Sequence, residues 1–419
     1  MKTENSTCQT VQPLVPLCLR HAILGMVAGT LALSLTLGSA LAQSSDPIRV
    51  GAVAPKTGAL AGGAAVTFWP NIALWEQEVN ADGGLLMEDG TRRPVQIIEY
   101  DDRTDPSETI RSVQRLANND NADFIIAPYG TGLALAAAPI FDRLGYPMIN
   151  VSAITDQVDT MTSRYDGVFF TLGETTPLAQ GIAEQMVELR DAGEVGNRVA
   201  MVNVADAFGI ELAQAAGVIF EQNGFDVVYN RSYPPTIQDV SPVMSSVIDA
   251  NPDVFVAFSY PPDTFALTEA AQIQDLQVDA FYTAVATPFP SYRERFGDSI
   301  NGVFGVGGVN PDSERFIEYE QAHIEVAGQG PDYWASAVTY ASLEVLAQAI
   351  EGVGAPDRDA VTEYIKNNPF DTVMGEWVFE DQRINNYWTV GQWQDGKFHG
   401  IRATGDLEGA VEPIRKEGW

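Results

Sequence analysis

The feature that most constrains the fold of this chain is a regular alternation of short apolar runs with amphipathic stretches. Each apolar run ends in a turn that contains Gly or Pro, and a stretch with helical spacing of apolar residues follows. Such alternation is typical of parallel βαβ units with right-handed crossovers. It predicts an α/β fold with doubly wound, Rossmann-like sheets.

The alternation occurs twice. In the first half it predicts one helix through Ile72 and Val79, together with strands over 48–53, 95–100, 124–127 and 148–151 and helices over 106–118 and 133–144. The rhythm restarts beyond Gly173, with strands over 199–203, 227–233, 254–258 and 280–284 and helices over 209–222, 240–250 and 264–276. A long helix over 333–351 and β-rich segments over 376–379 and 387–394 follow.

The first 42 residues have the three parts of a secretory signal peptide: basic residues, an apolar run over 22–42 and the small-x-small sequence Ala40-Leu41-Ala42. The apolar run is also long enough to span a bilayer, so a retained anchor is the alternative. We expect cleavage after Ala42 and a periplasmic product. Both cysteines, Cys8 and Cys18, lie in this leader, so the exported chain has no disulfide.

The exported chain is longer than one hydrophobic core usually reaches, which predicts two lobes. The first lobe is expected to comprise residues 47–171 and 307–372, and the second 172–306 and 373–419. The hinge between them consists of three crossings, predicted near 171–173, 303–309 and 371–375.

The chain is strongly acidic, with 24 Lys and Arg against 56 Asp and Glu and a formal net charge of −32. Such a surface repels phosphate backbones and anionic headgroups, which excludes nucleic acid and membrane surfaces as expected partners. Excess surface acid also serves solvation in saline media, and we favour that explanation over a specific acidic patch.

Loops that leave the carboxyl ends of parallel strands form the ligand sites of open α/β sheets. Two facing lobes therefore predict one site on loops 54–63, 128–132, 152–156 and 258–263. In the first lobe, a Gly-rich loop and a hydroxyl-rich loop each precede a helix, whose free N–H groups suit a carboxylate or carbonyl oxygen. The candidate ligand residues of these loops are Tyr129, Thr131, Ser152, Ala153, Ile154 and Thr155. The alternative is that they only form turns and helix caps.

The second lobe offers aromatic side chains at equivalent places. Phe208 and Tyr260 follow predicted strands and could cover an apolar ligand, although burial in the core is the alternative. Catalysis has no support, because the chain lacks nucleophile–base, P-loop and dinucleotide motifs and its exported histidines, His323 and His399, are far apart. We therefore predict no enzyme, no cofactor, no catalytic residue and no metal site.

With these loops placed, the sequence resembles the branched-chain amino-acid-binding protein family, the type I periplasmic binding proteins of ABC transporters. The resemblance spans nearly the whole exported chain and rests on seven segments in a shared order: Gly51–Gly58, Tyr100–Pro106, Tyr129–Gly132, Gly145–Ser152, Asp206–Gly209, Thr372–Phe379 and Gln392–Gly396. It implies a monomeric clamp that captures a small amino acid or related carboxylate or amide and delivers it to a membrane permease.

By position, the resemblance implies ligand-oxygen contacts at Thr131 and in the loop from Ser152 to Thr155, with Tyr260 and Phe208 over the pocket. Two departures stand out. Arg103 and Gly130 occupy the positions of the family's disulfide, and no carboxylate stands near Ala284, where the family's ammonium-binding acid is expected. The missing acid favours a ligand without an α-ammonium group, since an unpaired buried charge is costly.

Two alternatives remain for the function. The same clamp could present its ligand to a receptor kinase or chemoreceptor, which the sequence does not separate from transport. An exported hydrolase is the other alternative, disfavoured by the missing catalytic motifs.

Overall fold

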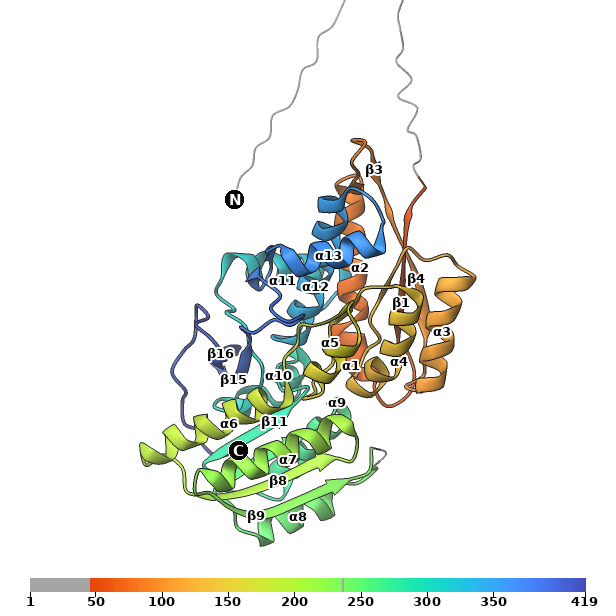
Figure 1. Ribbon diagram of the computed structural model, residues 1–419. Coiled ribbons are helices and arrows are strands. Elements are labelled where there is room, and N and C mark those ends of the chain that lie inside the picture. Colours follow the sequence, from red (N-terminus) through yellow and green to blue (C-terminus); the bar gives the residue numbers. More distant parts are fainter. Residues whose placement is uncertain (1–45, 236) are drawn as a thin grey trace, which may run out of the picture. The chain divides into compact units, whose positions relative to one another are not determined.

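The computed structural model describes residues 46–235 and 237–419 (Figure 1). The predicted signal peptide, its cleavage after Ala42 and both cysteines lie outside the described residues. Across the described ranges, no helix is long and apolar enough to cross a membrane.

The first lobe is built on short parallel strands. Strands β1 (Ile48–Ala54), β4 (Val95–Asp101) and β5 (Phe124–Ile126) form a sheet of order β4-β1-β5, and β6 (Met148–Asn150) pairs with β7 (Val168–Phe170). A small hairpin joins β2 (Leu85–Leu86) to β3 (Arg92–Arg93). The helices of this lobe are α1 (Ala61–Thr67), α2 (Trp69–Ala81), α3 (Pro106–Asn118), α4 (Thr131–Leu144), α5 (Val158–Arg164), α11 (Glu314–Ala327), α12 (Ala335–Val353) and α13 (Arg358–Asn367).

Strand β1 supplies side chains to two separate cores. Val50 and Ala52 belong to the core that includes α1, α2 and α12, whereas Val53 packs with Val113 of α3 and Phe141 of α4. Because successive side chains of a strand point to opposite faces, helices cover both faces of this sheet. The first lobe is therefore doubly wound, as predicted.

The second lobe contains one seven-stranded sheet of order β16-β15-β12-β11-β10-β8-β9. Five of its strands run parallel to one another: β8 (Arg198–Val204), β9 (Asp226–Tyr233), β10 (Val254–Phe258), β11 (Ala280–Ala284) and β12 (Phe304–Val306). Strands β15 (Trp388–Gln394) and β16 (Lys397–Ala403) extend it antiparallel. The helices are α6 (Thr175–Asp191), α7 (Ala207–Gln222), α8 (Ser241–Asp249), α9 (Pro261–Ile273) and α10 (Pro290–Phe296), with the 3₁₀ turn η1 (Gly297–Ile300).

The predicted boundaries of the two lobes stay a prediction. A hairpin that follows α13 bears on the third crossing between the lobes. Strands β13 (Phe370–Thr372) and β14 (Gly375–Trp377) pair with each other and pack near α12, and Arg383 still bridges to Phe170 of β7. The chain joins the second-lobe sheet only at β15. This pairing favours a third crossing between 384 and 388 rather than at 371–375.

The predicted fold class is confirmed, and several predicted elements coincide with the observed ones, among them α3, β10 and β11. Several helices were not predicted: α1, α5, α6, α10, α11 and α13. Helix α6 was missed, although Leu178, Ile182 and Met186 stand at helical spacing and are buried. The helix predicted through Ile72 and Val79 is α2, and the short helix α1 precedes it. Helix α2 begins just before Pro70, a residue that suits the first turn because it has no N–H.

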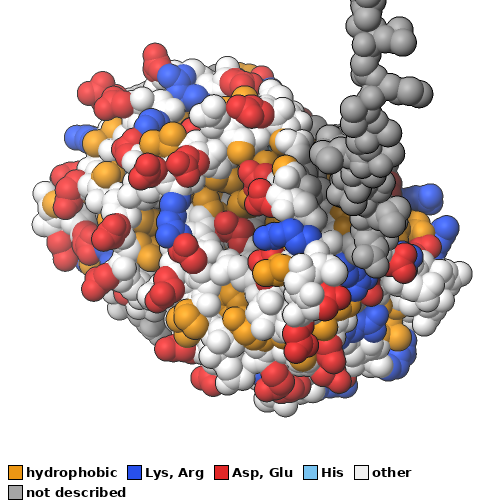
Figure 2. Space-filling model, turned by 90° about the horizontal axis from the view of Figure 1, so that it is seen from above, with side chains coloured by type: hydrophobic (Ala, Val, Ile, Leu, Met, Phe, Trp, Pro, Cys, Tyr) orange, Lys and Arg blue, Asp and Glu red, His pale blue; other side chains and the backbone are white. Residues whose placement is uncertain are grey.

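Acidic side chains are spread over the face of the molecule seen in Figure 2, with Lys and Arg side chains between them. Many of these charges form exposed ion pairs, such as Lys56 with Glu99 and Arg295 with Glu269. A dispersed pattern of this kind agrees with solvation as the reason for the acidic composition.

Gly307 provides a test of the packing where β12 leaves the sheet. Its φ is +76°, and an added β-carbon would lie 2.1 Å from the ring of Trp334. Gly307→Ala should lower the free energy of unfolding by about 2–4 kcal/mol, from backbone strain plus overpacking. Gly328→Ala, at a φ of +72° with no atom within 4 Å, is the matched control and should cost about 1 kcal/mol. Urea unfolding measures the free energy of unfolding of both variants. An equal loss in both would show that the Trp334 ring moves aside without cost.

Candidate functional site

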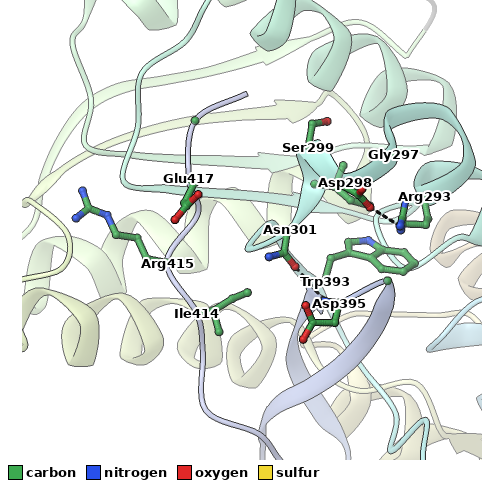
Figure 3. Close-up of a pocket in the computed structure, with 13 residues that line it drawn as sticks. Arg293, Gly297, Asp298, Ser299, Asn301, Trp393, Asp395, Ile414, Arg415 and Glu417 are labelled. Carbon is green, nitrogen blue, oxygen red and sulfur yellow. Dashed lines mark hydrogen bonds and ion pairs between the residues drawn. The ribbon is translucent and has the colours of Figure 1, made fainter.

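A hollow of about 730 Å³ lies at one edge of the second-lobe sheet (Figure 3). It is lined by charged and aromatic side chains, including Arg293, Asp298, Trp393 and Arg415. Residues 299–301 of its wall directly precede β12, so it opens at the amino ends of the parallel strands. The predicted ligand loops leave the carboxyl ends, at the opposite edge, and this hollow is therefore separate from them.

The two predicted first-lobe loops are bound to each other. The Thr131 hydroxyl accepts a hydrogen bond from the Ile154 N–H (3.1 Å) and donates to the Ile154 carbonyl (3.3 Å), and the side chain is only 3% exposed. The Ser152 hydroxyl accepts from the Gly130 N–H (2.8 Å). These hydroxyls therefore hold the loops following β5 and β6 together.

The start of α4 keeps free donors beside these loops. Gly130 precedes the helix with a φ of +100°, and no side chain caps the first turn. A β-carbon at Gly130 would lie 2.7 Å from Leu60, so glycine allows this close approach of the 54–63 loop. The first N–H groups of a helix have no internal partners and carry its positive dipole end, which suits a carboxylate.

The other predicted first-lobe residues make separate contacts. Tyr129 is buried against α1: its ring meets that of Phe68 edge-on, and a β-carbon at Gly63 would lie 2.3 Å from its hydroxyl. Burial raises the pKa of Tyr129 to about 12. Ala153 packs in the core beside α4, and the Thr155 hydroxyl donates to Glu211 of α7 at 2.9 Å.

The predicted second-lobe aromatics form one unit at the carboxyl ends of β8 and β10. The rings of Phe208 and Tyr260 stack with centroids 5.3 Å apart. The Tyr260 hydroxyl donates to Asp206 (2.5 Å), whose other oxygen accepts from the Gly209 N–H (3.0 Å) and so caps α7. Burial, and then the Asp206 carboxylate, raise the pKa of Tyr260 well above its ordinary value.

Two residues beside this unit were not singled out from the sequence. Asp263, in the first turn of α9, is 7% exposed, and burial followed by the nearby Asp206 charge raises its pKa to about 6. The Tyr233 hydroxyl, at the end of β9, is buried without a hydrogen-bond partner among the described residues. Burial and the nearby Asp263 raise the pKa of Tyr233. The sequence could have shown that they lie at strand ends, since Asp263 falls in the predicted 258–263 loop. It could not have shown that they are buried.

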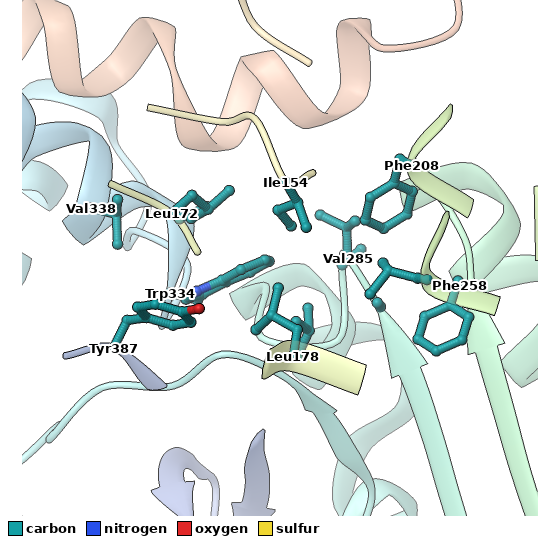
Figure 4. Close-up of a cluster of buried hydrophobic side chains, with 14 of the residues drawn as sticks. Ile154, Leu172, Leu178, Phe208, Phe258, Val285, Trp334, Val338 and Tyr387 are labelled. Carbon is teal, nitrogen blue, oxygen red and sulfur yellow. The ribbon is translucent and has the colours of Figure 1, made fainter. Parts of the chain in front are cut away.

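An apolar floor joins the two sets of loops (Figure 4). Ile154 of the first lobe belongs to the same buried cluster as Phe208, Val285 and Leu178 of the second, and the ring of Trp334 lies beside them. Val285 directly follows β11, where the resemblance places an ammonium-binding acid. The observed side chains there are apolar.

The described part of the chain has no group of three or more His, Asp or Glu side chains suited to a metal ion. His323 is fully buried, with Nδ1 2.9 Å from the Gln329 carbonyl oxygen, and burial lowers its pKa. It is therefore a structural residue.

Residues 47–397 match the family described as periplasmic binding protein. The chain belongs to the periplasmic binding protein family. Among its relatives, an amino acid binding protein of Pseudomonas aeruginosa is 24% identical over 385 residues, which cover 88% of this chain and 96% of the relative. Leu/Ile/Val-binding protein homolog 7 of Brucella abortus is also 24% identical, over 390 residues that cover 86% of this chain and 92% of the relative. The predicted resemblance to branched-chain amino-acid-binding proteins is thus confirmed.

Solved structures of the family share the fold. A branched-chain amino acid transporter substrate-binding protein of Streptococcus pneumoniae, in complex with isoleucine, matches with a TM-score of 0.71, 16% identity and coverage of 88% of this chain and 100% of the other. A solute-binding protein of Rhodopseudomonas palustris, in complex with 3,4-dihydroxybenzoic acid, matches with a TM-score of 0.73, 21% identity and coverage of 88% and 99%.

Thr131 tests the bonding between the first-lobe loops. Thr131→Val should lower the free energy of unfolding by about 1–3 kcal/mol, because the buried N–H and carbonyl of Ile154 lose their partner. Thr131→Ser retains the hydroxyl and is the matched control. Urea unfolding measures both, and a valine variant as stable as the wild type would contradict a structural role for the hydroxyl.

Proposed function

We propose that this protein is an exported periplasmic clamp of an ABC uptake system, which captures a small amino acid or a related carboxylate or amide and delivers it to the membrane permease. The observation that carries the proposal is the meeting of an uncapped helix start, an aromatic pair and buried carboxylates around one apolar floor. The ligand would be bound passively and released unchanged. The leader would direct export.

The first lobe would hold the carboxylate of the ligand. The free N–H groups at the start of α4 are the donors, because the hydroxyls of Thr131 and Ser152 already bond within the loops. In this proposal these side chains, with Tyr129, Ala153, Ile154 and Thr155, shape the loops, and the backbone makes the charged contact.

The second lobe would hold a positively charged or donor group. Asp206 and Asp263 lie close enough for the charge of one to raise the pKa of the other, and neither forms an ion pair within the described ranges. An ammonium group between them would relieve this repulsion. These acids therefore support an amino acid over a plain carboxylate, although the position near Ala284 is apolar.

The two solved relatives named above set the alternatives, since one was crystallised with isoleucine and the other with an aromatic acid. The apolar floor, with Phe208 and Tyr260 stacked beside it, suits the hydrocarbon part of either. Charge in the second lobe is what distinguishes them: a benzoate has no cationic group to pair with Asp206 and Asp263, and a dihydroxybenzoate offers only hydroxyl donors.

Thermal unfolding with matched ligands tests the ligand class. L-leucine and L-isoleucine should raise the melting temperature, because a ligand that binds only the folded state stabilises it. Their deaminated counterpart 4-methylpentanoate and benzoate should have little effect. A shift with the two plain acids alone would refute the role of the carboxylates while retaining the clamp. No shift with any of the four would refute the ligand class.

The affinity for L-leucine should depend on pH through Asp263. With a pKa of about 6 in the free protein, the ionised fraction of this carboxyl rises about tenfold between pH 5 and pH 7. An ammonium pairs with the ionised form, so affinity should rise by about the same factor over that range and fall as the acid is protonated. Titration calorimetry at pH 5, 6 and 7 measures this.

Asp263→Asn should weaken binding at pH 7 and remove the pH dependence. Asp239→Asn is the control: this exposed acid of the same lobe has a lowered pKa, because Ser241 hydrogen-bonds its carboxylate, and it stays ionised throughout. Affinity in the wild type that is constant, or that increases towards pH 5, would contradict an ammonium at Asp263.

A further inference from the structure

We propose that Glu211 controls the closure of the clamp, and thereby ligand affinity, without contacting the ligand. Glu211 lies on α7 of the second lobe, and its carboxylate accepts three hydrogen bonds from the first-lobe loop that follows β6. The donors are the Thr155 hydroxyl (2.9 Å), the Asp156 N–H (3.3 Å) and the Gln157 side-chain amide (3.3 Å). One residue of the second lobe thus binds three consecutive residues of the first.

Asp156 makes the reciprocal contact. Its carboxylate accepts from the N–H and the hydroxyl of Thr176, at 2.8 and 2.6 Å. Thr176 lies in the first turn of α6. Glu174, the residue before this helix, forms no side-chain cap. Asp156 therefore satisfies an N–H at the helix start from the other side of the boundary, and Thr175 adds a weaker bond to Glu211 (3.4 Å).

These contacts lie at the surface of the protein. Glu211, Asp156, Gln157 and Thr176 line a surface hollow of about 420 Å³ that continues along the outer side of α7 past Gln214 and Val218. The apolar floor is formed by other residues. A ligand held over that floor is therefore not required to touch Glu211, and we call Glu211 with residues 155–157 and 176 the rim latch.

The rim latch can exist only when the lobes are together, because its donors and acceptors belong to different lobes. Hydrogen bonds to a charged acceptor are stronger than neutral ones, and losing one typically shifts an equilibrium by about tenfold. A ligand that requires the closed clamp binds with an apparent affinity equal to its intrinsic affinity multiplied by the fraction of closed protein. Glu211 therefore acts on every ligand by the same factor.

This also assigns a different role to Thr155. Its hydroxyl is fully buried, donates to Glu211 and accepts from the Gln157 N–H (3.2 Å). The hydroxyl has no remaining hydrogen atom to donate to a ligand. In this proposal Thr155 is a positioning residue of the latch.

Small-angle X-ray scattering of the ligand-free protein tests the latch independently of the ligand. Glu211→Ala should shift the population about tenfold towards the open form and increase the radius of gyration, while circular dichroism stays that of the wild type. Gln214→Ala, an exposed residue on the same helix beside the same hollow, is the control and should leave the radius unchanged. Thr155→Val removes one of the three bonds and should open the clamp less than Glu211→Ala does, and the double variant should open it no further than Glu211→Ala.

A radius of gyration in Glu211→Ala equal to that of the wild type would overturn the proposal. An additive effect of Glu211→Ala and Thr155→Val would overturn the shared latch. If Glu211→Ala does not fold, Glu211→Gln replaces it: the amide oxygen can still accept but has no charge, so an intermediate radius supports the latch and an unchanged one refutes it.

Discussion

Parallel pairing within each sheet is the constraint on which the cleft depends. In the second lobe, the parallel pairing of β8 with β9 and β10 brings Asp206, Tyr233 and Tyr260 together at the carboxyl ends of these strands. In the first lobe, β5 and β6 belong to separate sheets, and a hydrogen bond from the Gly130 N–H to the Ser152 hydroxyl joins the loops that follow them. An antiparallel arrangement would send alternate loops to opposite edges and disperse these groups.

The polar groups at the cleft divide into those already paired and those still free. In the first lobe, the hydroxyls of Thr131 and Ser152 form hydrogen bonds between the two loops. The backbone N–H groups at the start of α4 have no side-chain cap. In the second lobe, burial raises the pKa values of Asp206 and Asp263, and neither has a cationic partner among the described residues. The first lobe thus offers partial positive charge, and the second offers negative charge.

Local patterns accounted for most of the fold. The 3.6-residue period located α3 to the residue, and the run of apolar residues located β10 and β11, because each of these elements buries one regular face or both. The missed helix α6 carries the same period. A short-range period does not show which segments far apart in the chain pair with each other. The pairing of Phe170 with Arg383, which favours a third crossing beyond 383, is an example.

The sequence by itself determined the α/β class and the loops at which a ligand site can form, because both follow from short-range periodicity and turn residues. Only the tertiary structure decided what each side chain in those loops does. Tyr129 packs edge-on against Phe68, Thr131 bonds Ile154, and Thr155 bonds Glu211 of α7. The burial of Asp263 could not be predicted from the sequence either. Hydrogen-bond partners and desolvation come from segments distant in sequence, and only packing brings those segments together.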